Sequence, residues 1–197
     1  MKRTALYMLV AGLFAVTLFA ADPVSRLDAA RLQAKLDRIA KGSPTRGKTL
    51  ATTPITETEI NSYLRYELSD RIPPGVTEPW VSILEEGRLS GRATVDLARV
   101  GQNRKSGGML DPFNLLTGSL PLTVNGVLRT KNGIGTFAVE SASISSVPVP
   151  IWMLQEIVSY YSKSESSPNG VALDQPFALP NGIREIQTAR GQATVVQ

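Results

Sequence analysis

The alternation of hydrophobic and polar positions is clearest between residues 120 and 144, where it predicts a β-hairpin. The first strand is expected over residues 120–129, and its two-residue period is that of a sheet with one buried face. Asn132 and Gly133 supply the turn, because both residues tolerate a positive φ. The return strand is expected over residues 135–144. The inward face of this hairpin is expected to carry Leu122, Val124, Phe137 and Val139.

A helical period begins directly after the hairpin. Residues 147–150 contain two prolines, which have no N–H to donate, so the sheet ladder is expected to end there. Pro150 suits the start of a helix, and hydrophobic residues then recur every three or four positions over residues 151–161. This helix is expected to lie across the hairpin, with the amphipathic Trp152 at the border of its apolar face. That face is expected to comprise Ile151, Leu154, Ile157 or Val158, and Tyr161.

Residues 55–68 carry the clearest helix start in the chain. Thr56 is expected to be the N-cap, and Glu59 stands three residues later, which is the spacing of a capping box. The segment from Ile72 to Gly75 contains two prolines and ends the helix. The apolar face of this helix is expected to comprise Ile60, Tyr63, Leu64 and Leu68.

The rest of the chain offers weaker patterns. Phe177, Leu179 and Pro180 are expected to re-enter the core. The other expected elements are a thin amphipathic helix at 24–41, a linker at 43–53, strands at 80–84 and 89–97, an exposed loop at 101–111, a helical turn at 112–118, and a final hairpin with strands at 183–186 and 193–196.

The N-terminus has the pattern of an export signal. Lys2 and Arg3 precede eighteen uncharged residues, 4–21. That run is also long enough to cross a bilayer, and cleavage after Ala20 or Ala21 leaves a large residue three positions back. A cleaved signal is the preferred interpretation, and a retained anchor is the alternative. Either way, the protein is expected to be exported, in the periplasm or elsewhere outside the cytoplasm.

Together these patterns predict an α+β fold, in which a strongly curved antiparallel sheet wraps around two amphipathic helices. Three parts are expected: a signal peptide or anchor at 1–21, a separate short helix with a flexible linker at 22–54, and one α+β domain at 55–197.

Composition narrows the chemistry. The 197 residues include no cysteine and no histidine, which excludes disulfides, thiolate metal sites, cysteine nucleophiles and Ser-His-Asp triads. Without Lys2 and Arg3, 19 basic residues face 17 acidic ones, a balance that gives no basic face for nucleic acid. Adjacent carboxylates such as Glu85 and Glu86 fall in an expected turn, and the serines of residues 141–146 have no evident base. No enzyme activity, metal or cofactor is therefore expected.

The opening helix resembles a known family. Its sequence over residues 55–64, ITETEINSYL, is similar to the ITEQEINxYL-type helix of small bacterial envelope proteins of the YceB kind. These belong to the tubular lipid-binding (TULIP) superfamily, with mycobacterial LmeA-like proteins as further relatives. The order of helix, bent hairpins, second helix and final hairpin over residues 55–197 is also similar. This chain lacks the lipoprotein cysteine and adds residues 24–41, so lipid anchoring does not carry over.

The resemblance implies a curved sheet with two helices and the binding of an apolar, lipid-like ligand. With the aromatic-rich helix at 151–161, it predicts an envelope protein that binds or shuttles such a ligand in a groove between sheet and helix. The membrane surface is a further expected contact, and nucleic acid is not. The alternative is a structural or scaffolding envelope protein with a dry core and a protein partner. Ligand-binding residues are expected to be Leu122, Val124, Phe137, Val139, Trp152, Leu154, Val158, Tyr161, Tyr63 and Leu64.

Overall fold

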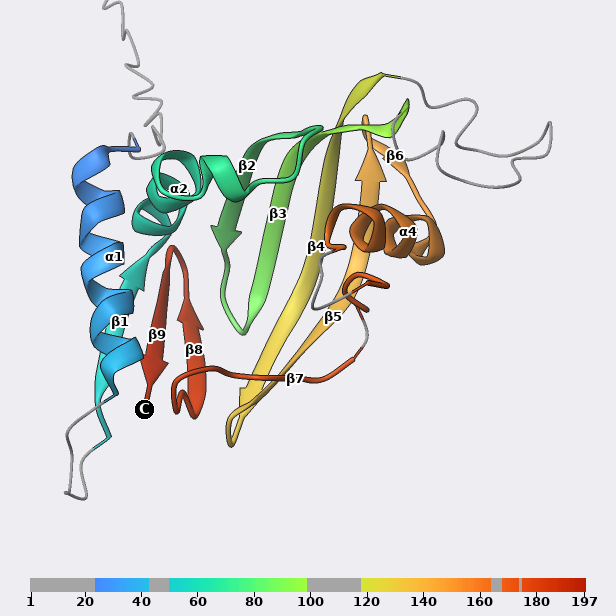
Figure 1. Cartoon of the computed structure of the whole chain (residues 1–197). Helices are drawn as coiled ribbons and strands as arrows, with labels where there is room; N and C mark the ends of the chain where they lie inside the picture. Colours follow the sequence, from blue (N-terminus) through green and yellow to red (C-terminus); the bar gives the residue numbers. More distant parts are fainter. Residues whose placement is uncertain (1–23, 43–49, 99–117, 164–167, 174) are drawn as a thin grey trace, which may run out of the picture.

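Two antiparallel sheets and three α-helices make up the described part of the chain, which comprises residues 24–42, 50–98, 118–163, 168–173 and 175–197 of a computed structural model (Figure 1). This is the predicted α+β class. The expected export segment and the loop at 101–111 lie outside the described residues, as do most of the expected linker and all but Gly118 of the expected helical turn.

The larger sheet has six strands, and its main path follows the chain from strand to adjacent strand. β7, Phe177–Ala178, lies off this path and pairs with β5. The other strands, in their order across the sheet, are β2 Val76–Ile83, β3 Arg88–Asp96, β4 Ser119–Lys131, β5 Ile134–Ile144 and β6 Val147–Pro148.

The central β4–β5 hairpin is confirmed. Asn132 and Gly133 form its turn with φ values of 52° and 80°. The ladder is irregular between Asn125 and Gly126. A Cβ at Gly126 would lie 2.5 Å from the ring of Phe137, so the absent side chain makes room for that ring on the face of the sheet.

The sheet ladder was predicted to end at Val147, and this is wrong, because one more short strand, β6, begins there. Ser145 and Ser146 make a tight turn with positive φ, and β6 then pairs with the end of β5. The N–H of Val149 also donates to Ala142 O at 3.0 Å. Prolines are tolerated here because β6 is an edge strand, where a missing donor leaves no ladder bond unmade.

Helix α4, Ile151–Tyr161, begins after Pro150 and packs against the larger sheet. Its buried residues include Met153, whereas Ile151 is 55% exposed, so the expected inward face was wrong at its first position. A stripe that starts at Met153 has the same spacing as one that starts at Ile151, and the period alone does not distinguish them. The buried cluster beneath α4 comprises Val95, Leu97, Leu122, Ala142, Ile144, Met153, Leu154 and Ile157.

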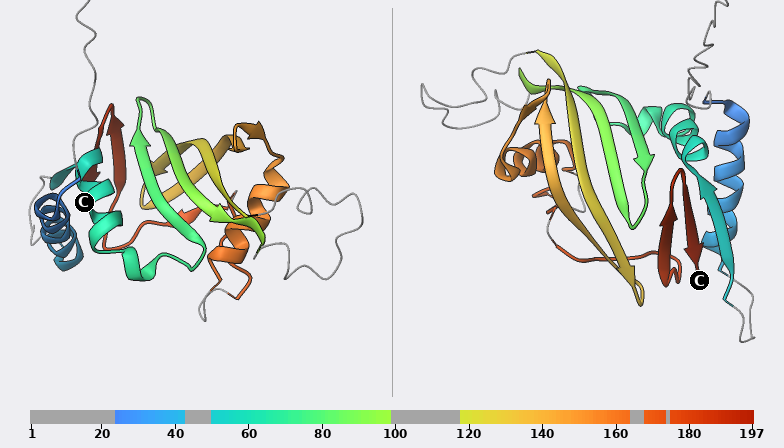
Figure 2. Two further views of the ribbon diagram at one scale, coloured as in Figure 1. Left: turned by 90° about the horizontal axis from the view of Figure 1, so that it is seen from above. Right: turned by 180° about the vertical axis from the view of Figure 1, so that it is seen from behind.

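The smaller sheet lies at the other end of the molecule (Figures 1 and 2). Its strands, in order, are β1 Thr52–Thr56, β9 Gln192–Val196 and β8 Glu185–Ala189. The final hairpin is therefore confirmed, while β1 was not predicted, because its residues fall at the end of the expected linker and the start of the expected helix. Phe177 and Pro180 are exposed, contrary to expectation, and Leu179 packs beside this sheet.

Helix α1, Arg26–Lys41, is capped by Ser25, whose side chain accepts from the N–H of Asp28. The hydrogen bond from Ser25 lowers the pKa of the Asp28 carboxyl, and Arg31 lowers it further, against the opposing effect of burial. The sequence predicts a helix separate from the domain, but in the structure α1 packs within the same unit. Its Leu32 and Ile39 share a buried cluster with Ile55, Ile183 and Val195.

Candidate functional site: a groove between α2 and β2

Helix α2, Glu57–Tyr66, starts where β1 ends. The predicted capping box is confirmed: Thr56 Oγ1 accepts from the N–H of Glu59 at 3.2 Å, and the Glu59 carboxylate accepts from the N–H of Thr56 at 2.9 Å. The cap thus fixes the point at which the chain leaves the smaller sheet and turns towards the larger one.

The most buried face of α2 is polar, which the expected apolar stripe did not indicate. Its buried residues are Glu59, Asn61 and Ser62, while Ile60, Tyr63 and Leu64 are half-buried. These polar groups bond to other elements. Glu59 pairs with Lys35 of α1 at 2.7 Å, and Ser62 Oγ accepts from the N–H of Ser25 at 3.0 Å.

Side chains of α2 also cover the outer edge of β2. The amide of Asn61 donates to Val81 O and accepts from Val81 N, both at 2.8 Å, as a neighbouring strand would. The Glu57 carboxylate accepts from the N–H of Ile83 at 2.7 Å. These bonds satisfy backbone groups of an edge strand, whose unpaired edge would otherwise attract another chain.

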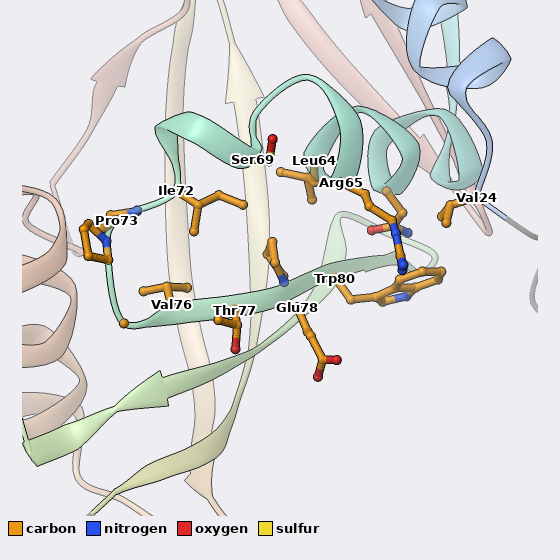
Figure 3. Close-up of a pocket in the computed structure, with 14 residues that line it drawn as sticks. Val24, Leu64, Arg65, Ser69, Ile72, Pro73, Val76, Thr77, Glu78 and Trp80 are labelled. Atoms are coloured by element: carbon orange, nitrogen blue, oxygen red, sulfur yellow. The ribbon is translucent and has the colours of Figure 1, made fainter.

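Beyond Asn61, helix and strand diverge and a groove opens between them (Figure 3). One wall is the end of α2 with the short 3₁₀ helix η1, Ser69–Arg71, and the other wall is β2. The volume of the groove is about 610 Å³. Ile72 and Val76 lie on opposite walls, and Leu64 projects from the helix above them (Figure 3).

The two ends of the groove differ in chemistry. Pro73 lies at one end, whereas Val24, Arg65 and Trp80 gather at the other (Figure 3). Arg65 extends towards the Trp80 ring, and its guanidinium makes no hydrogen bond or ion pair to another residue that the structure describes. This end therefore combines an unpaired cation with an amphipathic ring.

The backbone of β2 is irregular between Thr77 and Trp80, and Glu78 has a φ of 51°. The side chains of Thr77 and Glu78 point away from α2 (Figure 3). After this irregularity, the side chain of Trp80 lies on the α2 side of the strand. Trp80 also borders two further hollows, of about 570 and 280 Å³.

The structure places the predicted ligand-binding residues in three regions. Tyr63 packs against the buried cluster under α1, and Leu64 lines the groove. The others lie along α4 and the strands beneath it. Of these, Leu122 and Leu154 belong to the buried cluster, Val124, Val139, Val158 and Tyr161 pack against it, Phe137 lies over Gly126, and Trp152 is 49% exposed.

The interface between α4 and the sheet is filled where ligand contact was expected. Leu154 is completely buried, and Leu122 is 8% exposed. The hydroxyl of Tyr161 donates to Asp96 O at 2.8 Å, which ties the end of the helix to β3. These contacts make this region part of the core in the structure.

Most of the groove residues were missed from the sequence, among them Arg65, Ile72, Val76 and Trp80. The available signal was the short connection between helix and strand, which forces α2 and β2 to lie near each other. Its two prolines were interpreted only as the end of the helix.

Within the described ranges, no three acidic residues gather in a way that could hold a metal ion. No helix in the same ranges is long and apolar enough to cross a membrane. The comparisons with known proteins add no relative: no family model, curated protein or solved structure matches this chain.

Proposed function

We propose that this protein is a non-enzymatic, exported envelope protein that binds an apolar, lipid-like ligand in the groove between α2 and β2. The observation that carries the proposal is the groove itself, an apolar trough whose volume of about 610 Å³ falls within the roughly 300–1,000 Å³ of small-molecule sites. The groove is also hollow at Leu64, one of the residues predicted to bind ligand.

Apolar side chains on both walls favour a hydrocarbon chain as the occupant. Leu64, Ile72 and Val76 approach the space from helix, connection and strand. Each methylene group transferred from water into such a space contributes about 0.8 kcal/mol. The amide of Asn61 already bonds to β2, so it is not available to a polar ligand.

The place of Val24 supports a role at the membrane. Val24 lines one end of the groove, and only Asp22 and Pro23 separate it from the apolar segment 4–21. A retained anchor would hold this end of the groove beside the bilayer. A cleaved signal would instead release the protein into the periplasm or another extracytoplasmic space, where the groove would carry its ligand between membranes.

We also propose that this chain resembles the tubular lipid-binding superfamily, and that its larger sheet curves around two helices as in that superfamily. Support comes from the element order, and from the contacts of α2 and α4 with the same six-stranded sheet at β2 and β5. The walls of the ligand site differ from those predicted from the sequence, because the interface between α4 and the sheet is filled, whereas the end of α2 and η1 leave a groove beside β2.

A pair of tryptophan variants tests the function and locates the site. The full chain would be expressed in bacteria, purified from the periplasmic and membrane fractions, and extracted for lipid analysis by mass spectrometry. Wild-type protein is expected to carry lipid. Trp80→Ala is expected to lower the lipid-to-protein ratio several-fold, because it removes the ring at the end of the groove, whereas the matched Trp152→Ala leaves the ratio unchanged.

Each other outcome changes the proposal. Loss of lipid in Trp152→Ala but not in Trp80→Ala would move the site to the α4 side of the sheet. Repeated absence of lipid from the wild-type protein would favour the alternative, a structural envelope protein with a protein partner.

A further inference from the structure

We infer that the groove selects an amphiphile with an anionic headgroup, bound with its hydrocarbon chain between Leu64, Ile72 and Val76 and its headgroup at Arg65. This inference rests on the proposed function and adds the charge and the orientation of the ligand. It follows from the different chemistry of the two ends of the groove.

The charge at the Val24 end of the groove is positive. Arg65 is the one cationic residue among those that line the groove, and it is not neutralised by any residue that the structure describes. The one acidic lining residue, Glu78, points away from α2 (Figure 3). A guanidinium presents a planar fork of donors that matches carboxylate and phosphate oxygens.

The dipole of α2 opposes an anion here but is the weaker effect. Arg65 lies in the last turn of α2, where the helix carries about half an elementary negative charge. The guanidinium carries a full positive charge on a long side chain, which holds it away from the backbone carbonyls. The net field at the mouth of the groove therefore favours an anion.

The apolar and polar groups are arranged in the order of an amphiphile. From Pro73 to Leu64 the lining is largely hydrocarbon, and at the far end Arg65 meets Trp80 (Figure 3). A tryptophan ring can contact an acyl chain with its apolar body while its N–H reaches a polar group. The headgroup end is also the Val24 end, and in the sequence only Asp22 and Pro23 separate Val24 from the apolar segment 4–21.

The test compares two ligands that have the same acyl chain. Trp152→Phe leaves Trp80 as the only tryptophan, since the chain contains two, so fluorescence then reports on the groove. In this background, lysophosphatidylglycerol, an anionic lipid, and the uncharged monoacylglycerol would be titrated below their micelle concentrations. The anionic lipid is expected to bind at least about tenfold more tightly, a difference typical of one charge-assisted contact.

Variants assign that preference to Arg65. Arg65→Gln is expected to bring the two affinities to within about twofold while the affinity for monoacylglycerol stays the same, and Arg65→Lys is expected to keep part of the preference. The control is Arg71→Gln, an exposed arginine of η1 that does not line the groove. Melting curves of each variant check that these surface changes leave the fold intact.

Failure of this inference and failure of the proposed function give different results in this experiment. Equal affinity for both lipids in the wild-type protein, or a preference that survives Arg65→Gln, would overturn the inference and leave the apolar groove standing. Binding of neither lipid would overturn the proposed function itself.

Discussion

At the scale of single residues, Asn61 has a structural role that its position in an amphipathic helix does not suggest. It is 1% exposed, and its amide makes the two bonds to Val81 that a neighbouring strand would make. Such a buried donor and acceptor must be paired, because an unpaired buried polar group costs about 1–3 kcal/mol. Asn61 therefore closes the edge of β2 and marks the point at which the groove begins.

Replacing Asn61 by alanine is expected to lower the free energy of unfolding by about 2–4 kcal/mol, because both backbone groups of Val81 lose their partners. Asn125→Ala is the matched control, since that amide makes an exposed bond to Ser141 and its loss should cost less than about 1 kcal/mol. Urea denaturation measures both. Similar midpoints for the two variants would mean that water replaces Asn61 at the edge of β2.

At the scale of elements, polar contacts dock α1 on α2. Lys35 Nζ reaches both oxygens of Glu59 and Pro54 O, each at 2.7 Å. The hydroxyl of Tyr63 donates to Gln33 at 2.9 Å. With the apolar contacts of Leu32 and Ile39, these bonds place α1 where Val24 can line the groove.

The Lys35–Glu59 pair is largely shielded from water, so breaking it leaves a carboxylate without its counter-ion in a buried position. Lys35→Ala is expected to cost about 2–4 kcal/mol of stability, somewhat less than for a fully buried pair because Lys35 is partly exposed. Arg31→Ala breaks the exposed pair with Asp28 and is expected to change stability little, because water screens an exposed ion pair.

Hydrogen exchange of the backbone amides shows which elements lose stability in Lys35→Ala. Faster exchange throughout α1 in Lys35→Ala, with α4 unaffected, would show that the pair docks this helix. Uniformly faster exchange in all helices would contradict such a local role.

At the scale of the whole molecule, the two sheets are joined through side chains and loops. Thr130 of β4 donates to Ile186 O at 3.0 Å and accepts from Ile186 N at 2.7 Å. The N–H of Gly87 donates to Thr188 Oγ1 at 2.7 Å. The chain thus connects the sheet that packs under α4 with the sheet that packs under α1.

Thr130→Val keeps the size of the side chain and removes both bonds to Ile186. We expect a loss of about 1–3 kcal/mol and faster hydrogen exchange at Ile186, with little change in β4 itself. Thr136→Val serves as the control, because the Thr136 hydroxyl makes a long, exposed contact of 3.5 Å. An exchange rate at Ile186 that Thr130→Val leaves unchanged would contradict a connection through this hydroxyl.

The predictions from sequence were most accurate where neighbours in the chain decide the structure. The capping box of Thr56 and Glu59 and the turn at Asn132 and Gly133 both depend on a few adjacent residues. The orientation of α4 was less predictable, because stripes from Ile151 and from Met153 have the same period. For the candidate site, the sequence indicated Leu64 but not the wall opposite it.

The sequence by itself determined the α+β class, the caps and turns, and the absence of cysteine and histidine chemistry, because these follow from local backbone preferences and from composition. Only the tertiary structure decided that α1 packs within the molecule, that α2 buries polar groups, and that its end stands apart from β2. The reason is that these features depend on contacts such as Lys35 with Glu59 and Asn61 with Val81, 24 and 20 positions apart. A periodic pattern records which face of an element is apolar, and the partner of each face is set by how the whole chain packs.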